Sequence, residues 1–430
     1  MRCLSQIRWS SVTLLVAVVG FSWSLKHVIA NDRSETLQSV ASNSLPNNLP
    51  QRNPDGYAAT FSTQGAVDLK GEFFQAQGAN GRSCATCHIP QDAWSINPST
   101  LQRLFDETAG THPVFNLLDA NNPSMDVSTF EGRLAAYSML LSRGVFRRGG
   151  APRVDAEWEL IAVDDPHGFA NLNRLVHWRR VMPTINFAQG SATINWDGGN
   201  SVGTDQHAGF VNQATRNVIG AQQGPPASSE VIAEIVAFEE SLFTAQLISL
   251  GVGRLDDDGA RGGPEALSTM ERRAGRFDLF DAWVGDQNPR RAQIARGQEI
   301  FNSTNSSGGR CGACHDSANN GTNTNNLLFD IQTASAAVRT SDLPLYTFRN
   351  RTTGEVRQLT DAGRGNVTGR WTDLGRFKTP TLRALAARAP YFHNGVASTL
   401  ESVVRFYEQH LGFVFTDQER ADLVAFLKAL

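Results

Sequence analysis

Two copies of the pentapeptide Cys-x-x-Cys-His constrain this 430-residue chain more than any other feature. The copies are Cys84-Ala-Thr-Cys87-His88 and Cys311-Gly-Ala-Cys314-His315. Two cysteines at this spacing can each form a thioether to one porphyrin, and the histidine that follows can ligate the iron. The sequence therefore predicts two covalently bound haem c groups, ligated by His88 and His315. Two haems in one chain indicate redox chemistry.

Cys-x-x-Cys also occurs in zinc knuckles and in thioredoxin-like redox pairs. A zinc site needs two further ligands nearby, and a redox pair does not need the trailing histidine. The chain has five cysteines, and the fifth is Cys3, which lies in a predicted leader. No cysteine is left for a structural disulfide, and we favour haem attachment over both alternatives.

Residues 1–30 have the pattern of a secretory leader, with Arg2 and Arg8 before an apolar run and the small residue Ala30 at its end. We predict a signal peptide that is cleaved after Ala30. The alternative is an uncleaved anchor, although the apolar run is shorter than the roughly 20 residues that span a membrane. Because c-type haem is attached after export, leader and motifs both predict a periplasmic protein.

With 39 basic and 42 acidic residues, the chain gives no indication of binding to nucleic acid or to an anionic membrane. At 40% hydrophobic residues it can bury two cores. Residues 31–55 are polar and lack helical periodicity, so we predict a disordered or extended lead-in with order beginning near Tyr57.

A helix, a loop and a haem motif follow one another twice along the chain. Apolar spacing predicts opening helices over 65–77 and 291–301, and closing helices over 230–246 and 416–430. This weak repeat predicts a mainly α protein of two class I cytochrome c-type domains packed face to face. The boundaries that we expect are 56–250, with a large irregular insertion at 95–225, then a linker at 251–290 and a second domain at 291–430.

The methionines limit the ligands of the second haem. There are five methionines, and none follows Met270. The second haem thus lacks the methionine that gives electron carriers their high potential. The candidates for its sixth ligand are Tyr391, His393, Tyr407 and His410.

Three segments of the second half resemble the bacterial dihaem cytochrome c peroxidase and MauG family. They are Lys378-Thr-Pro-Thr-Leu-Arg383, Ala389-Pro-Tyr-Phe-His393-Asn-Gly395 and Thr399-Leu-Glu-Ser-Val-Val-Arg-Phe-Tyr407. In that family the residue fourteen after the histidine ligates the second haem, as methionine in peroxidases and as tyrosine in MauG-like members. The resemblance implies Tyr407 as this ligand. An aromatic residue packed on the haem edge is the alternative.

The resemblance extends to the first half, from Phe73 to Cys84. It implies that peroxide reacts at the first haem, beside a glutamine and an acid that follow a Trp-Asp-Gly motif. Trp196-Asp197-Gly198 matches the motif, and Gln213 is the best match for the glutamine. The acid is absent, because Gln222 or Gln223 stands at its position. Arg216 could substitute for it, or could form a surface salt bridge.

Other matches are looser. Trp196 resembles the tryptophan that relays electrons between the haems, with core packing as the alternative. Asn186 and Pro390 resemble ligands of a calcium ion between the haems. Histidines of the insertion could ligate the first iron until the second haem is reduced, but each candidate there suits core or surface as well. The insertion candidates are Met125, Met139, Met182, His112, His167, His177 and His207.

The resemblance implies an enzyme that reduces hydrogen peroxide at the N-terminal haem with electrons passed by way of the C-terminal haem. The electrons would come from a small cytochrome c or cupredoxin. A MauG-like member would instead oxidise an aromatic side chain of a partner protein. The alternatives are a dihaem electron carrier without catalysis and a haem-dependent dioxygenase. A homodimer is a further expectation.

Overall fold

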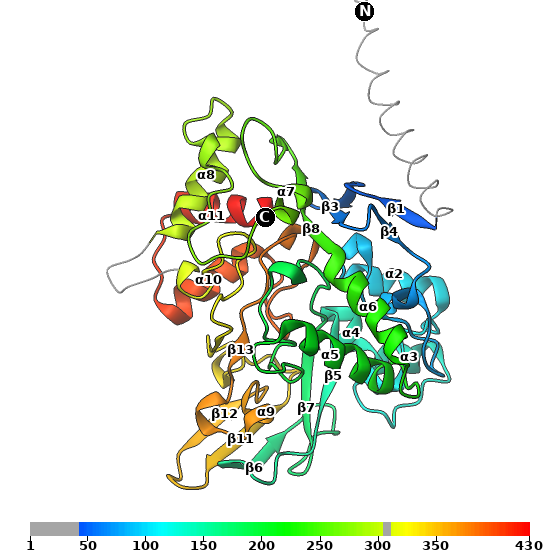
Figure 1. Cartoon of the computed structure of the whole chain (residues 1–430). Helices are drawn as coiled ribbons and strands as arrows, with labels where there is room; N and C mark the ends of the chain where they lie inside the picture. The colour runs from blue at the N-terminus through cyan, green and yellow to red at the C-terminus, as the bar shows by residue number, and fades with distance from the viewer. Residues whose placement is uncertain (1–42, 304–310) are drawn as a thin grey trace, which may run out of the picture.

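The computed structural model describes residues 43–303 and 311–430 (Figure 1). The predicted signal peptide, Cys3, the lead-in as far as residue 42 and part of the loop before the second motif lie outside the described residues. None of the helices in the two described ranges is long and apolar enough to cross a membrane.

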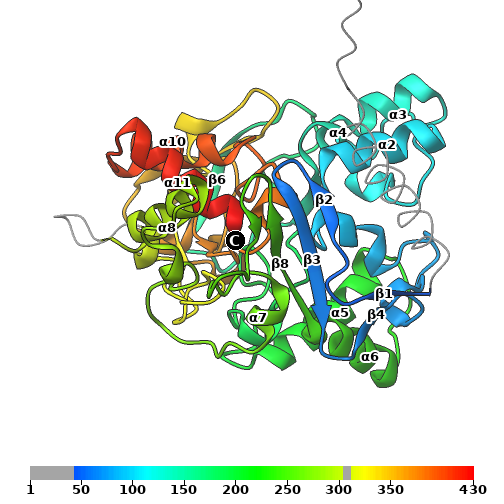
Figure 2. The ribbon, with the colours of Figure 1, turned by 90° about the horizontal axis from the view of Figure 1, so that it is seen from above.

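An antiparallel four-stranded sheet joins the start of the described chain to the end of the first half. Its order is β2 (Gln51–Asn53), β3 (Gly56–Ser62), β8 (Leu242–Ser249) and β9 (Gly253–Arg254). Figure 2 shows β3 and β8 running between the helices of the second half and those of the insertion. Residues 43–55 are extended and not disordered, and order begins before Tyr57, because β1 (Ser44–Pro46) and β2 pair with other strands there.

The helices of the first half differ from two predictions. The segment 65–77 forms β4 (Ala66–Asp68), paired with β1, and one short turn, η1 (Glu72–Phe74), instead of a helix. The backbone at Gly71 is extended, and pairing with β1 replaces helical hydrogen bonds. The closing helix α6 (Ser229–Ser241) is shorter than expected, because the chain after it pairs with β3 as strand β8.

The helices predicted for the second half are confirmed as α8 (Pro289–Asn302) and α11 (Asp417–Ala429). Thr416 and Glu419 form the capping box that begins α11. α8 and α11 pack closely at Gly297, where a Cβ would come within 1.9 Å of the Asp422 carbonyl oxygen. Helix α10 (Leu400–Leu411) lies beside them and carries Tyr407 (Figure 1).

The segment predicted as a linker contributes to the core around these helices. Phe277, Phe280 and Trp283 are buried in one cluster with Phe301 and Phe426. α7 (Pro264–Ser268) also lies in this segment and packs against β8. The segment 251–290 is therefore part of the packed structure.

The insertion, expected to be irregular, is built from regular elements. It contains the helices α2 (Pro98–Thr108), α3 (Phe130–Ala136), α4 (Ser138–Arg143) and α5 (Gln206–Gly220). It also contains the strands β5 (Val145–Gly150), β6 (Trp158–Asp164) and β7 (Leu175–Arg180), with β5 and β7 paired antiparallel.

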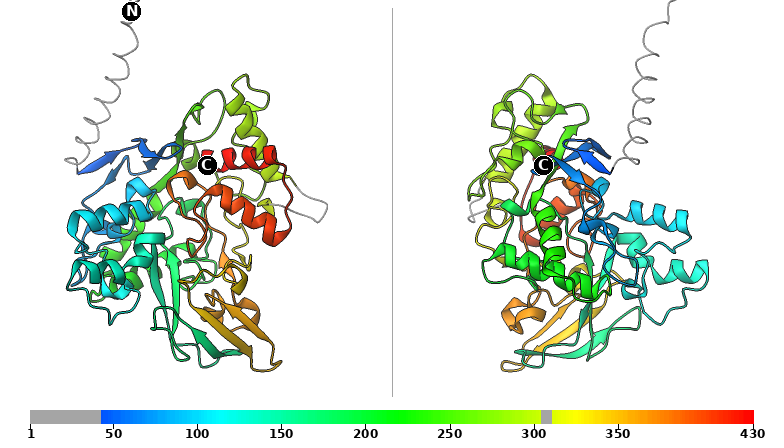
Figure 3. Two further views of the ribbon diagram at one scale, coloured as in Figure 1. Left: turned by 180° about the vertical axis from the view of Figure 1, so that it is seen from behind. Right: turned by 45° about the vertical axis from the view of Figure 1, so that its right-hand side comes forward.

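The two halves share one sheet. β6 of the insertion pairs with β11 (Leu345–Asn350), which pairs in turn with β12 (Val356–Leu359). Figure 3 shows this sheet projecting away from the helices. The remaining described strands and α-helix are β10 (Leu328–Phe329), β13 (Phe377–Lys378) and α9 (Gly365–Thr368), besides several single 3-10 turns. Helices and five small sheets together make up the described chain, so the mainly α expectation is not confirmed.

Candidate functional site

The first motif occupies a short turn, η2 (Cys84–Thr86), which Ser83 and Thr86 cap with reciprocal hydrogen bonds. The His88 Nδ1 lies 2.9 Å from the Trp94 carbonyl oxygen and 2.9 Å from the Thr184 hydroxyl. These contacts orient the ring and leave Nε2 for another partner. Burial lowers the pKa of His88 to about 4, so the imidazole is neutral, as a metal ligand must be.

The second motif repeats this arrangement. The His315 Nδ1 lies 2.5 Å from the carbonyl oxygen of Gly321, again six residues further on. Burial lowers the pKa of His315 to about 4. The ring of Phe73 lies 6.1 Å from that of His88, and the ring of Phe301 lies 6.2 Å from that of His315. The two motifs are therefore held by equivalent contacts.

A cavity of about 660 Å³ opens beside the first motif and is lined by Cys84, Cys87 and His88. Gln213 on α5 also lines it, and the Gln213 Oε1 is buried without a hydrogen-bond donor among the described residues. That amide can accept a hydrogen bond from a small ligand. Arg216, one turn later, lines the same cavity from an exposed position, where its guanidinium donates to Asn200.

The two glutamines at the position of the absent acid point to different places. Gln222 is buried and lines the cavity, and its amide nitrogen lies 3.7 Å from the Cys84 sulfur. Gln223 is exposed with φ at 55° and is not among the residues that line the cavity in the described chain. The structure therefore places Gln222, and not Gln223, beside the first motif.

Some of the other candidates in the insertion also line the first cavity, and others lie elsewhere. Met182 and His177 line the first cavity. His207 is exposed and pairs with Glu240 on α6, and the His167 ring bonds to a backbone carbonyl. His177 is thus the histidine of the insertion that the structure brings to this cavity in the described residues.

A smaller cavity of about 190 Å³ lies beside the second motif and is lined by Cys311, Cys314, His315 and Tyr407. Burial raises the pKa of the Tyr407 phenol, and the neighbouring cysteines add to that rise. Three of the four candidate sixth ligands line this cavity, namely Tyr391, His393 and Tyr407. The fourth, His410, hydrogen-bonds within its own helix to the Phe406 carbonyl oxygen.

Trp196 lies between the two cavities and lines both. Its indole Nε1 donates to the Arg180 carbonyl oxygen at 2.8 Å. The residues that line both cavities are Arg180, Val181, Pro183, Trp196, Lys378 and Thr381. Trp196 is thus the aromatic residue among those that line both cavities in the described chain.

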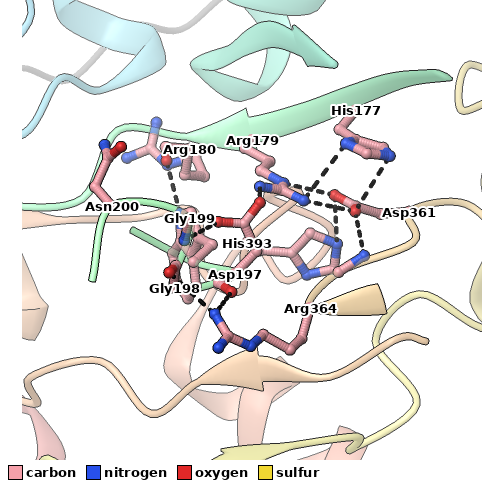
Figure 4. Close-up of polar contacts among 12 residues, drawn as sticks. His177, Arg179, Arg180, Asp197, Gly198, Gly199, Asn200, Asp361, Arg364 and His393 are labelled. Carbon is pink, nitrogen blue, oxygen red and sulfur yellow. Dashed lines mark hydrogen bonds and ion pairs between the residues drawn. The ribbon is translucent and has the colours of Figure 1, made fainter. Parts of the chain in front are cut away.

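A buried charge network that the sequence did not predict includes Asp197, the residue after Trp196, together with Arg179 and Asp361 (Figure 4). Arg179 donates to Asp197 at 2.5 Å and makes two bonds of 2.8 Å to Asp361. Burial raises the pKa of Asp361, but the Arg179 charge outweighs this and holds the pKa below its usual range. His177 and His393 lie 3.6 and 3.9 Å from the Asp361 carboxylate, one beside each cavity.

One signal of this network can be found in the sequence, since Arg179 and Arg180 end a strand that begins with Leu175 and Val176 and also contains His177 and Trp178. All six residues of this strand, β7, are buried. Buried charges are paired or bind metals, so two adjacent arginines in such a strand indicate partners elsewhere in the chain. The partner Asp361 is 182 residues away and could not be identified from spacing.

The predicted calcium site stays a prediction. The Asn186 side chain accepts from the Thr244 N–H at 2.8 Å and donates to the Thr244 carbonyl at 3.0 Å. Pro390 lines the second cavity. The described residues contain no group of three or more His, Cys, Asp or Glu side chains that could hold a metal ion.

Sequence comparison finds similar proteins among the cytochrome c peroxidases and MauG. The cytochrome c peroxidase IdrP2 of Denitromonas iodatirespirans is 32% identical over 185 residues, which are 39% of this chain and 46% of that protein. The methylamine utilization protein MauG of Methylorubrum extorquens is 28% identical over 267 residues, 59% of this chain and 64% of MauG. The chain is similar in sequence to bacterial cytochrome c peroxidases and to MauG.

The chain spans about half the length of the cytochrome c peroxidases that it matches. No family model matches it. The solved structure of a MauG-like protein associated with microbial copper homeostasis covers 90% of this chain and 92% of its own, at 17% identity and a TM-score of 0.41. The resemblance to the peroxidase and MauG family that the sequence predicted is confirmed by the sequence matches.

Haem c is the cofactor that the peroxidase and MauG family implies, and the residues of both sites fit it. None of the four motif cysteines forms a disulfide in the described chain, and each motif lines its own cavity. Both histidines bind a backbone carbonyl through Nδ1 and keep Nε2 for an iron. Cys84, Cys87 and His88 would hold one haem, and Cys311, Cys314 and His315 the other.

Proposed function

We propose that this chain is an exported dihaem c-type oxidoreductase that reduces hydrogen peroxide in the first cavity, with electrons passed by way of the second. The main support is that Trp196 lines both cavities, which are each built on a haem-attachment motif. The first cavity is the larger one and contains the unpartnered amide oxygen of Gln213, as a site for a small oxygen ligand requires. A small cytochrome c or cupredoxin would be the electron donor.

The bound haem would supply the redox chemistry, and the side chains orient and hold the reactants. Trp94 and Thr184 fix the imidazole of His88. The amide of Gln213 can accept one hydrogen bond from peroxide and donate another. Arg180 fixes the indole of Trp196 through its carbonyl oxygen.

Replacement of Trp196 by phenylalanine tests the electron path. We expect peroxide turnover to fall by about tenfold or more, equivalent to about 1.4 kcal/mol in the barrier, because the indole and its bond to Arg180 are lost. Steady-state turnover with a reduced cytochrome measures this. Trp371→Phe is the matched control, since Trp371 is buried at 8% exposure but lines neither cavity. Equal turnover in both variants would contradict a path through Trp196.

A second candidate function is MauG-like oxidation of an aromatic side chain on a partner protein. The observation that favours it is the position of Tyr407, which lines the second cavity together with His315. A phenolate oxygen would hold the second iron at a lower potential than methionine does.

Tyr407→Phe tests whether this phenol ligates the second iron. We expect the low-spin EPR signal of the second haem to change, because phenylalanine offers no oxygen, while the signal of the first haem stays the same. Tyr391→Phe is the control, since the Tyr391 hydroxyl already donates to the Leu385 carbonyl oxygen at 2.9 Å. An unchanged second signal in Tyr407→Phe would show that Tyr407 only packs in the cavity.

A further inference from the structure

Glu239 is a buried acid near the end of α6 and lines the first cavity. Its side chain is 2% exposed, and its Oε2 has no hydrogen-bond partner among the described residues. Burial raises the pKa of Glu239 to about 8, and the charge of Glu240 adds to the rise. The carboxyl group is therefore mostly neutral at pH 7 and carries a proton.

The repeat within the chain shows that packing does not require an acid here. Residues 235–242 read Ile-Val-Ala-Phe-Glu-Glu-Ser-Leu, and residues 423–430 read Leu-Val-Ala-Phe-Leu-Lys-Ala-Leu. The two phenylalanines pack in equivalent ways, Phe238 on Phe73 at 4.7 Å and Phe426 on Phe301 at 5.5 Å. The residue after each lines the corresponding cavity, and it is Glu239 in the first half but Leu427 in the second.

A leucine would satisfy the fold at this position, whereas a buried carboxyl without a partner costs stability. Such a group is expected where function needs it. Two carboxyl groups line the first cavity, Asp197 and Glu239. Asp197 is ion-paired with Arg179 and also accepts from the Gly199 N–H. Of the two carboxyl groups that line the first cavity in the described chain, Glu239 is therefore the one that can carry a proton.

The surroundings of Glu239 place it beside the haem-attachment motif. Burial raises the pKa of the Cys84 thiol, and the nearby Glu239 carboxyl adds to that rise. Glu240, on the same helix, pairs with His207 of α5 at 3.0 Å. Cys84 and Glu240 are the titratable groups that interact with Glu239 in the described part of the chain.

We propose that Glu239 is the proton donor of the first cavity and gives its proton to an oxygen atom of hydrogen peroxide. The proposal rests on the proposed function and assigns the acid that is absent at Gln222 and Gln223. Reduction of one peroxide breaks its O–O bond, consumes two electrons from the external donor and two protons, and forms two waters. One proton comes from the Glu239 carboxyl, which becomes a carboxylate and is reprotonated from solvent. The other proton comes from solvent.

The test compares Glu239→Gln, Glu239→Leu and the control Glu240→Gln in the haem-loaded full chain. The infrared spectrum of the wild-type protein should contain the carbonyl stretch of a protonated carboxylic acid, which both Glu239 variants lose and Glu240→Gln keeps. Peroxide turnover should fall roughly 10²- to 10⁴-fold in both Glu239 variants, the usual contribution of a general acid. It should fall far less in Glu240→Gln, because burial is the larger cause of the raised Glu239 pKa and the Glu240 charge only adds to it. Glu239→Leu should melt no lower than wild type, because the second half carries leucine at this position.

The results of these measurements distinguish a failure of the role of Glu239 from a failure of the proposed peroxide reduction. Wild-type protein that reduces peroxide, with Glu239→Gln at the same rate, would overturn the role of Glu239 and leave the proposed function intact. Wild-type protein that does not reduce peroxide would overturn both. Absence of the carboxylic acid band in the wild type would overturn the inference alone, since the group would then hold no proton to give.

Discussion

Replacement of Cys84 and Cys87 by serine is expected to reduce peroxide turnover to background and to leave one covalent haem per chain. Serine cannot form the thioether, and a haem held only through His88 would exchange from the first cavity. The alkaline pyridine spectrum counts covalent haem per chain, and steady-state assays measure turnover. Retained turnover in this variant would show that the first cavity is not the site of reduction.

The Cys311→Ser and Cys314→Ser double variant is the matched control. It also leaves one covalent haem, so it corrects for a general effect of haem loss on folding. We expect its first haem still to respond spectroscopically to peroxide, while sustained turnover with a reduced cytochrome is lost. The two double variants thus assign separate roles to the two cavities.

Replacement of Asp361 by alanine is expected to lower the free energy of unfolding by about 3–5 kcal/mol, the usual result of removing one partner from a buried ion pair. Arg179 loses two hydrogen bonds of 2.8 Å and keeps only Asp197 as a carboxylate partner in the described structure. Urea unfolding of the haem-loaded protein measures the change. In the control Glu107→Ala, an exposed pair with Arg103 is broken, and the expected loss is about 0–1 kcal/mol. Equal losses in both variants would contradict a structural role for the network.

The ion pair between Arg179 and Asp361 also determines how the stability of the protein changes with pH. The pKa of Asp361 is held below its usual range, because the Arg179 charge outweighs the effect of burial. The stabilisation is therefore fully present above the unfolded pKa of about 4 and is lost as the pH falls below it. Wild-type protein should lose stability in this acid range more steeply than Asp361→Ala does.

Local patterns predicted the elements whose stability is local. The two haem motifs, the apolar spacing of α8 and α11 and the capping box at Thr416 all depend on residues close in sequence. The segment 65–77 was misread because its helical spacing lost to pairing between β4 and β1. The end of α6 was misread for the same reason, since β8 pairs with β3, which lies 180 or more residues earlier in the chain.

In the site, too, residues in recognisable local patterns were predicted, and residues whose role depends on distant contacts were not. Gln213 and Trp196 were found through a short motif, and both line the first cavity. The sequence could not decide between Gln222 and Gln223, because the two side chains of neighbouring residues point in different directions and spacing does not resolve which one faces the cavity. Asp361 could not be found, because its role comes from a contact with a strand in the other half. Glu239 was missed, although the repeat carries a signal for it, namely an acid where the second copy has leucine.

The haem bound in the first cavity is expected to react with peroxide, and the haem bound in the second cavity is not. The most direct test is the optical and EPR spectrum of the haem-loaded protein before and after one equivalent of hydrogen peroxide. We predict a high-spin ferric signal from the first haem that peroxide rapidly changes, beside a low-spin signal from the second. Two low-spin signals that peroxide leaves unchanged, before and after partial reduction, would contradict the account and favour an electron carrier.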